Sequence, residues 1–212
     1  MKHSNFKKIG KKQSGFTLIE LLTVVVILGI LAYVSMSAFS GSPNAANATA
    51  IRSGAMELSK GVGYINANIG TGIKTTPANN PLIYTGNTML DVLVVGSVAV
   101  GDDYKSKYAA IAMRPLETEF RITKRGSKGV EGEYTLLNYP VTMVDTCPAN
   151  KVCTVFKKVT KPVLDEILIR YGLEKTDAKT DIEKATTQDD PVVFQVDAAA
   201  QDTYTVKFAL IP

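Results

Sequence analysis

The feature that most constrains this chain is an apolar run of 24 residues, Phe16 to Phe39, close to its N-terminus. Its only charged residue is Glu20, and its other polar side chains are hydroxyls. As a helix, at about 1.5 Å per residue, the run reaches about 36 Å, enough for a bilayer core of about 30 Å. The run therefore predicts a membrane helix, which is to be separated from the globular part of the chain.

Lysines precede the apolar run and indicate its orientation. Five of the 24 basic residues lie within the first 15 positions, with no acidic residue among them: Lys2, Lys7, Lys8, Lys11 and Lys12. No comparable basic cluster follows the run, so the positive-inside rule predicts a cytoplasmic N-terminus and export of the rest. With 45% apolar and 21% charged residues, the 212-residue chain is too apolar for disorder and too ordinary for a polytopic membrane protein.

The junction between the lysines and the apolar run carries a specific motif. The string GFTLIELLTVVVILGILA, starting at Gly15, resembles the N-terminal segment of type IV prepilins and of the pseudopilins of type II secretion. The shared features are the glycine, the phenylalanine, a glutamate at the fifth residue after the glycine, and an unbroken apolar helix. The resemblance implies that a prepilin peptidase of the inner membrane cuts after Gly15 and that the new amino group of Phe16 is N-methylated. Glycine before the cut lets the backbone enter a protease cleft without a side chain.

Glu20 is the residue of this segment that most requires an explanation. A charged group inside a membrane helix costs about 2.5–3.5 kcal/mol on insertion scales, so a partner is expected. The resemblance implies that this partner is the amine of Phe16 on a neighbouring subunit of a filament. The alternative is a glutamate near the helix end that reaches into the lipid headgroups.

Two other ways of processing the N-terminus compete with the prepilin interpretation. An ordinary signal peptide would use residues 21–34 as its apolar core and be cut near Ser35, Ser37 or Ala38, releasing a secreted binding protein or enzyme. An uncleaved anchor would keep the whole segment. Within the prepilin interpretation, a major pilin, a minor pilin and a type II secretion pseudopilin share the same motif.

The region around residues 39–43 is expected to bend. Members of the family often carry a proline seven or eight residues beyond the glycine that corresponds to Gly29, whereas Ser37 stands in that region here and Pro43 comes later. Because proline removes a helix hydrogen bond, the bend is predicted near residues 39–43. Gly29 lowers helix stability by about 1 kcal/mol relative to alanine, and is a place where the helix can stretch on assembly.

Beyond Pro43 the hydrophobic pattern becomes one-sided. Apolar residues recur at alternating spacings of 3 and 4, which predicts a helix with one face on an apolar surface: Ala48, Ile51, Ala55, Leu58, Val62, Ile65 and Ile69. A β-sheet is the expected surface, and a coiled coil is the weaker alternative. Gly70 and Gly72 are expected to end the helix.

The rest of the chain, from residue 71 onward, is expected to form a globular head that contains both helices and strands. Asn87 or Thr88 could cap a short helix to Val95, although the same residues could form a strand. Further expected elements are a hairpin of residues 119–125 and 132–139, a strand over 152–159, a helix from Pro162 with Leu164, Ile167, Leu168 and Tyr171 on one face, and a terminal hairpin of 192–196 and 203–211.

The predicted fold class is α+β and type IV pilin-like, a long N-terminal helix packed on an antiparallel sheet. The predicted divisions are a cleaved leader (1–15), a membrane and filament-core helix (16–43), an amphipathic helix half (44–70) and a globular head (71–212).

The two cysteines, Cys147 and Cys153, predict a structural disulfide, because an exported chain with two cysteines usually oxidises them. A metal or redox site is the alternative. Its support is weak, because the spacing is not C-x-x-C and the only histidine, His3, belongs to the leader.

Other candidate sites have weaker sequence support. Asp102-Asp103 and Asp189-Asp190 have oxygen ligands suited to calcium but lack the spacing of a recognised loop, which favours solvated turns. A basic patch beside Phe120 could touch DNA, although a solvated hairpin tip is the expected structure: Arg121, Lys124, Arg125 and Lys128. No catalytic residue, cofactor or metal is predicted, because the processed chain lacks histidine, G-x-S-x-G and a P-loop.

The predicted function is therefore structural. The chain is expected to be a type IV pilin that sits in the inner membrane as a precursor and then assembles with its own copies into an extracellular filament for adhesion, motility or DNA uptake. A periplasmic pseudopilus is the alternative. The expected partners are prepilin peptidase and the assembly machinery, with nucleic acid left open. Cutting after Gly15 leaves 24 − 5 = 19 basic against 20 acidic residues, so the processed side chains sum to −1 and give no charge-based reason to expect nucleic acid.

Overall fold

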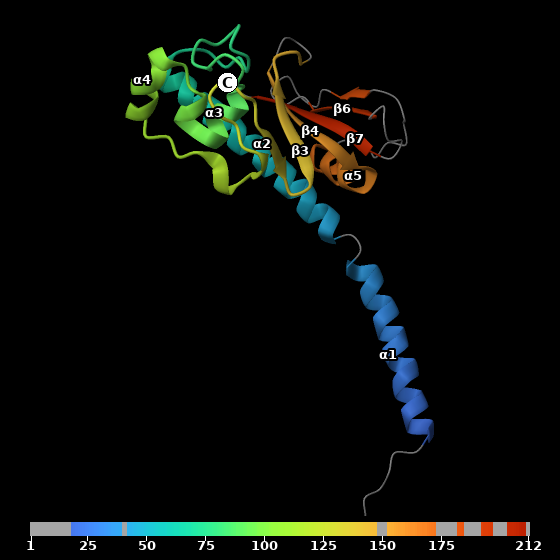
Figure 1. Ribbon diagram of the computed structural model, residues 1–212. Helices are drawn as coiled ribbons and strands as arrows, with labels where there is room; N and C mark the ends of the chain where they lie inside the picture. The colour runs from blue at the N-terminus through green and yellow to red at the C-terminus, as the bar shows by residue number, and fades with distance from the viewer. Residues whose placement is uncertain are drawn as a thin grey trace, which may run out of the picture. The chain divides into compact units, whose positions relative to one another are not determined.

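The structure is a computed structural model that describes residues 18–39, 42–147, 152–172, 182–184, 192–196 and 203–210 (Figure 1). The chain divides into two compact units, Met1–Ser42 and Pro43–Pro212. The first unit contains helix α1 (Leu18–Phe39), and α2 (Ser42–Ile69) starts at the boundary and belongs to the second. The predicted processing residues Gly15 and Phe16 lie outside the described residues.

The second unit combines helices with one sheet. Its further helical elements are α3 (Met89–Val95), η1 (Gly96–Ala99), η2 (Asp102–Tyr104), α4 (Lys105–Ala110), η3 (Leu116–Thr118) and α5 (Lys161–Arg170). Its strands are β1 (Arg121–Lys124), β2 (Glu133–Leu136), β3 (Tyr139–Val144), β4 (Cys153–Thr160), β5 (Ile182–Lys184), β6 (Val192–Val196) and β7 (Thr203–Ala209). They form a seven-stranded sheet in the order β1-β2-β3-β4-β7-β6-β5, in which every neighbouring pair is antiparallel. The architecture is α+β and consistent with a type IV pilin-like fold, as predicted.

The amphipathic pattern of residues 48–69 is confirmed as the face on which α2 packs. Six of the seven predicted residues are buried, from Ala48 to Ile65, and Ile69 is partly buried against the same core. This core also contains alternate residues of β3, namely Tyr139, Val141 and Met143. Figure 1 shows α2 running along the sheet. Apolar residues that repeat every 3.6 positions on the helix therefore pack against apolar residues that repeat every second position on the strand, in one core.

Two described helices lie within the range 16–70, where a long helix was expected. Helix α1 ends at Phe39 and α2 begins at Ser42, and residues 40–41 between them, within the range 39–43 where a bend was predicted, lie outside the described residues. Pro43 lies in the first turn of α2, where a missing backbone N–H removes no intrahelical hydrogen bond.

The hairpin predicted from residues 119–139 is correct at its start and wrong at its end. Strands β1 and β2 pair antiparallel, with Ile122 opposite Tyr134. However, β2 ends at Leu136, and Tyr139 opposite it begins a further strand, β3. The chain reverses between them with Leu137 at a φ of 55°, a left-handed conformation that usually calls for glycine or asparagine. Leucine carries no turn signal, and the neighbouring Asn138 by itself was too weak a signal to separate the two strands in the sequence pattern.

Residues 89–95, for which both a helix and a strand were considered, form helix α3. Its N-cap is Thr88, whose hydroxyl accepts a hydrogen bond from the backbone N–H of Asp91, while the Asp91 carboxylate accepts from the backbone N–H of Thr88. This reciprocal pair is a capping box, and it satisfies two backbone donors at the start of the helix. The local chemistry of Thr88 and Asp91 therefore favours the helix over the strand.

Two glycines of α2 are expected to respond in opposite ways to substitution by alanine. A Cβ at Gly61 would lie 2.7 Å from Leu93 Cδ2, and Leu93 is fully buried, whereas a Cβ at Gly63 would meet nothing within 4 Å. We expect Gly61→Ala to lower the free energy of unfolding by about 1–3 kcal/mol through overpacking. Gly63→Ala should raise it by up to about 1 kcal/mol through helix propensity. Urea unfolding of both variants measures the difference, and equal shifts would contradict the close α2–α3 packing.

Candidate functional site

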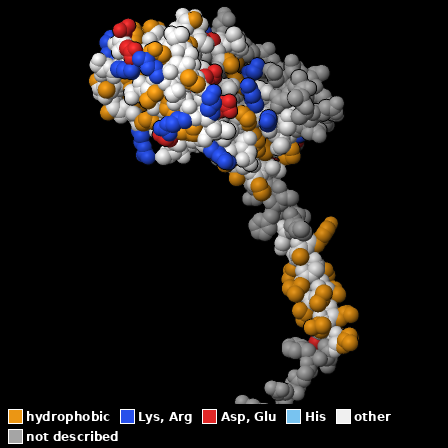
Figure 2. Space-filling model, viewed as in Figure 1, with side chains coloured by type: hydrophobic (Ala, Val, Ile, Leu, Met, Phe, Trp, Pro, Cys, Tyr) orange, Lys and Arg blue, Asp and Glu red, His pale blue; other side chains and the backbone are white. Residues whose placement is uncertain are grey.

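Helix α1 exposes apolar side chains on all of its sides. The exposed fractions of its large apolar residues run from 51% at Val24 to 82% at Leu18. Figure 2 shows these side chains in orange around the described part of the helix. Within that part, the hydroxyl of Thr23 donates to the carbonyl of Ile19, so it is satisfied by its own helix. A helix that is apolar all round is typical of one that is buried on every side in its working state.

Glu20 lies in the first turn of α1. A carboxylate at this end of a helix interacts favourably with the partial positive charge of the exposed backbone N–H groups. The structure thus places the one charge of the apolar run at the helix end that follows the predicted cut site. In the parts of the chain that the structure describes, no helix combines the length and the hydropathy of a membrane span.

The two cysteines form the disulfide that the sequence predicted, Cys147–Cys153, with Cα atoms 5.8 Å apart. Both are buried, and together with Val155 and Ala209 they form a small apolar cluster that is separate from the main core. Cys153 begins β4 and faces Val144, the last residue of β3. The disulfide therefore closes the connection between two neighbouring strands in the middle of the sheet.

Asp145, directly after β3, binds the connection between α2 and α3. Its Oδ1 accepts hydrogen bonds of 2.7 Å from both the backbone N–H and the hydroxyl of Thr75. Its Oδ2 accepts from the hydroxyl of Thr76 at 3.0 Å and from the amide of Asn79 at 3.4 Å. Partial burial raises the pKa of Asp145, but these hydrogen bonds outweigh it, so the pKa lies below its usual value.

Asp91 makes a second polar centre, fully buried between α3 and the β1–β2 hairpin. Its Oδ1 accepts from the Tyr134 hydroxyl at 2.6 Å and from the backbone N–H of Gly132 at 2.8 Å. Its Oδ2 serves the capping box, with the N–H of Thr88 at 2.8 Å. Burial, followed by the hydrogen bond to Asp91 and its negative charge, raises the pKa of Tyr134. The pattern Thr88-x-x-Asp91 is a capping-box signal in the sequence, although it does not reveal the partners on the hairpin.

The start of α2 is attached to the head by long-range polar contacts. The Arg170 guanidinium donates to the carbonyl of Ala45 at 2.9 Å and also binds the hydroxyl of Thr49. Arg52 lies 5.4 Å from the ring centroid of Tyr171, a cation–π contact. Asn47 reaches the Tyr139 hydroxyl at 3.4 Å. Helix α2 is therefore held by α5 and β3 from its first turns onward.

Two cations of the predicted basic patch are engaged in ion pairs. Lys128 binds Asp102 at 2.9 Å and lies 4.6 Å from the ring centroid of Tyr84, and Arg125 binds Glu117. The other two, Arg121 and Lys124, lie exposed on β1. Because neighbouring carboxylates offset half of the patch, the structure favours the solvated hairpin tip over a DNA-binding surface.

Asp102, one of the candidate calcium ligands, is also engaged in ion pairs. Asp102 accepts hydrogen bonds from Lys105 at 2.7 Å and from Lys128, and these lysines lower the pKa of its carboxyl group. Ammonium groups at a carboxylate compete with a cation, so the solvated-turn interpretation is favoured for Asp102 and Asp103. Asp189 and Asp190 lie outside the described residues. Among the residues that the structure does describe, no three His, Cys, Asp or Glu side chains gather as a metal site requires.

The family model of the prokaryotic N-terminal methylation motif matches residues 10–32. The match covers the end of the lysine-rich leader, Gly15, Phe16, Glu20 and most of the apolar run. Comparisons with curated proteins and with solved structures return no match.

Proposed function

We propose that this chain is the structural subunit of a type IV pilus. The proposal starts from the prokaryotic N-terminal methylation motif that the chain carries, which is the signature of type IV prepilins. The motif supports a precursor of the type IV pilin-like or pseudopilin kind in general, and precursors of this kind indicate a structural subunit. One observation carries the proposal. The methylation motif ends inside a helix that is apolar on every side and has a single carboxylate in its first turn.

In this proposal the leader and α1 act in sequence. The lysines keep the N-terminus in the cytoplasm, and the apolar run holds the precursor in the inner membrane. Prepilin peptidase cuts after Gly15, and the amino group of Phe16 is methylated. The assembly machinery then moves the subunit from the lipid into a bundle of α1 helices. There each fully buried Val, Leu, Ile or Phe side chain stabilises the bundle by about 1.5–3 kcal/mol relative to water.

The proposed role of Glu20 is to bind the Phe16 amine of a neighbouring subunit. In an apolar bundle the two opposite charges attract strongly, and each leaves the other unpaired if it is removed. The pair would therefore select the axial position at which a new subunit is added. Within the second unit, Arg170, Arg52 and Asn47 anchor α2 to the rest of the head, so α2 and the head would move together.

The N-terminus of the mature protein tests this proposal directly. We expect intact-mass analysis of the protein from its native membrane to give a chain that starts at Phe16 and carries one extra methyl group. Gly15→Leu should leave the leader attached, because a bulky side chain obstructs the protease cleft. A chain that starts near Ala38 would instead identify a signal-peptidase product and exclude the proposed function.

The same motif serves pili and secretion pseudopili, so a second measurement is needed for the finer assignment. Deleting the gene should remove surface fibres visible by electron microscopy if the chain is the major pilin. Unchanged fibres together with loss of a secreted enzyme would assign it instead to a type II secretion pseudopilus. Unchanged fibres without a secretion defect would point to a minor pilin.

A further inference from the structure

The connection between α2 and α3 contains a loop that folds on itself. Residues 71–80, here called the clasp loop, are held internally by Asn80 and are joined to the end of α2 by Asn66. The backbone N–H of Gly72 donates to Asn66 at 2.8 Å, and the Asn80 amide donates to the carbonyls of Gly72 at 3.2 Å and Lys74 at 2.9 Å. These bonds shape the loop but do not attach it to the sheet.

Asp145 supplies the attachment to the sheet. Its four hydrogen bonds reach Thr75, Thr76 and Asn79, and Thr75 is fully buried. The carbonyl of Thr75 in turn accepts from the backbone N–H of Met89, the first residue of α3, at 3.0 Å. One carboxylate thus connects the end of β3 with the clasp loop and, through Thr75, with the start of α3.

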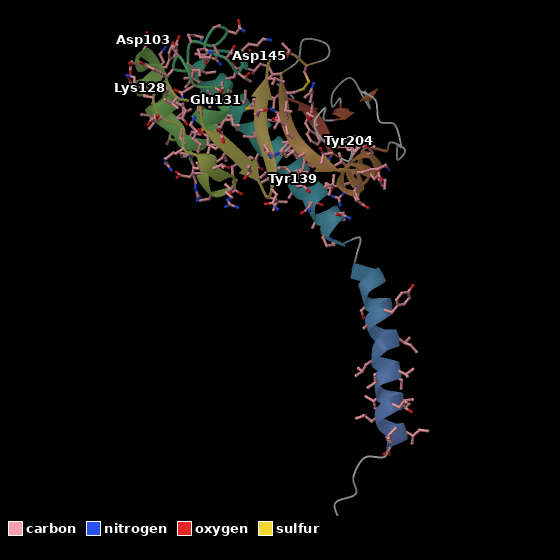
Figure 3. All side chains as sticks on the ribbon, turned by 45° about the vertical axis from the view of Figure 1, so that its right-hand side comes forward. Asp103, Lys128, Glu131, Tyr139, Asp145 and Tyr204 are labelled. Carbon is pink, nitrogen blue, oxygen red and sulfur yellow. A yellow bond between two sulfur atoms is a disulfide. The ribbon has the colours of Figure 1, made fainter. Side chains whose placement is uncertain are left out.

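The disulfide restrains the short segment that carries Asp145. Val144 is paired with Cys153 across the β3–β4 ladder, and Cys147 is bonded to the same Cys153. Both ends of the segment 144–147 are therefore held at one residue, and Asp145 lies between them. Figure 3 shows the labelled Asp145 and the yellow disulfide at the same end of the sheet.

We propose that the Cys147–Cys153 disulfide controls the clasp loop through Asp145, so that the loop is attached to the sheet in the oxidised chain and released in the reduced chain. A dithiol reductant breaks the S–S bond, leaving two cysteine thiols on the protein and a disulfide on the reductant. The connection after Val144 is then held only where it leaves β3 at Val144 and enters β4 at Cys153, and it loses the additional restraint at Cys147. The main core persists, because the cysteines belong to a separate apolar cluster. By linkage the coupling is reciprocal, so loss of the Asp145 bonds weakens the disulfide.

Hydrogen exchange of the full chain in detergent tests the first half of this coupling. We expect reduction to speed exchange of the Thr75 amide by about tenfold or more, while α2 and the β3–β4 ladder keep their protection. Asp145→Ala removes all four acceptor contacts and should produce the same loop exchange with the disulfide intact. Asp103→Ala, at an exposed aspartate of η2, is the matched control and should leave the loop unchanged.

Equilibration with glutathione tests the second half. The Asp145→Ala chain should hold less disulfide than the parent at the same ratio of glutathione to its disulfide. The equilibrium constant for disulfide formation should fall by the same factor by which reduction speeds loop exchange. The proposal is overturned if the Thr75 amide exchanges equally fast in both redox states. It is also overturned if reduction unfolds the sheet together with the loop, or if Asp145→Ala leaves the glutathione equilibrium unchanged. The double variant Cys147→Ser, Cys153→Ser checks the reduced state without a reductant and should exchange like it.

Discussion

Glu20→Ala should leave the precursor correctly cut and methylated but reduce filament assembly by about a hundredfold. The expected loss follows from the coupling energy of close, desolvated charge pairs, of which about 3 kcal/mol is a moderate example. In the variant, the Phe16 amine of each incoming subunit would enter the apolar bundle without a carboxylate partner. Quantifying sheared surface filaments against membrane-held subunits measures the effect.

Two matched variants test whether loss of the negative charge of Glu20 causes the loss of assembly. Glu20→Gln keeps the size and shape of the side chain, so it should fail like alanine if the negative charge is what matters. Glu57→Ala removes an exposed carboxylate of α2 whose surface ion pair with Lys60 contributes little, and it should assemble normally. Normal filament yield from Glu20→Ala would refute the assigned role.

Asp91→Ala should be the most destabilising single substitution in the head, lowering the free energy of unfolding by about 3–5 kcal/mol. The substitution leaves the Tyr134 hydroxyl and the backbone N–H of Gly132 without their acceptor in a fully buried site. It also removes half of the capping box at Thr88, a loss of about 1 kcal/mol in typical helices. Urea unfolding followed by circular dichroism measures the change.

A double-mutant cycle identifies the origin of this loss. If Asp91 and Tyr134 act as one unit, Tyr134→Phe should cost much less in the Asp91→Ala background than in the parent chain. Asp103→Ala, in an exposed 3-10 turn, is expected to stay within about 0.5 kcal/mol of the parent. Additive effects of the two core substitutions would show that the hydrogen bond between them contributes little.

The first 69 of the 212 residues could be interpreted from the sequence because the signals there are local. The lysine leader, the apolar run, Glu20 and the methylation motif are contiguous, and their meaning does not depend on the fold. The buried face of α2 is also local, since a spacing of 3 and 4 places Ile51, Leu58 and Ile65 on one side of any helix. The disulfide was predictable because the chain has only two cysteines.

The head was less predictable at the reversal between β2 and β3, where a leucine has the left-handed conformation. Leu137 turns the chain without glycine or asparagine at its position, so β3 was not separated from β2. The three-residue strand β5 is too short for an alternating pattern to stand out. In both places pairing with a neighbouring strand decides the conformation, and no local preference announces it.

The sequence by itself determined that this chain has a prepilin-type N-terminus, an apolar helix and an amphipathic helix joined to a mixed head. Only the tertiary structure decided which polar side chains hold that head together. Asp145 meets Thr75 across 70 positions, and Arg170 meets Thr49 across 121. A period or a motif is a property of neighbouring residues, whereas a hydrogen bond between distant segments exists only once the core has brought them within about 3 Å.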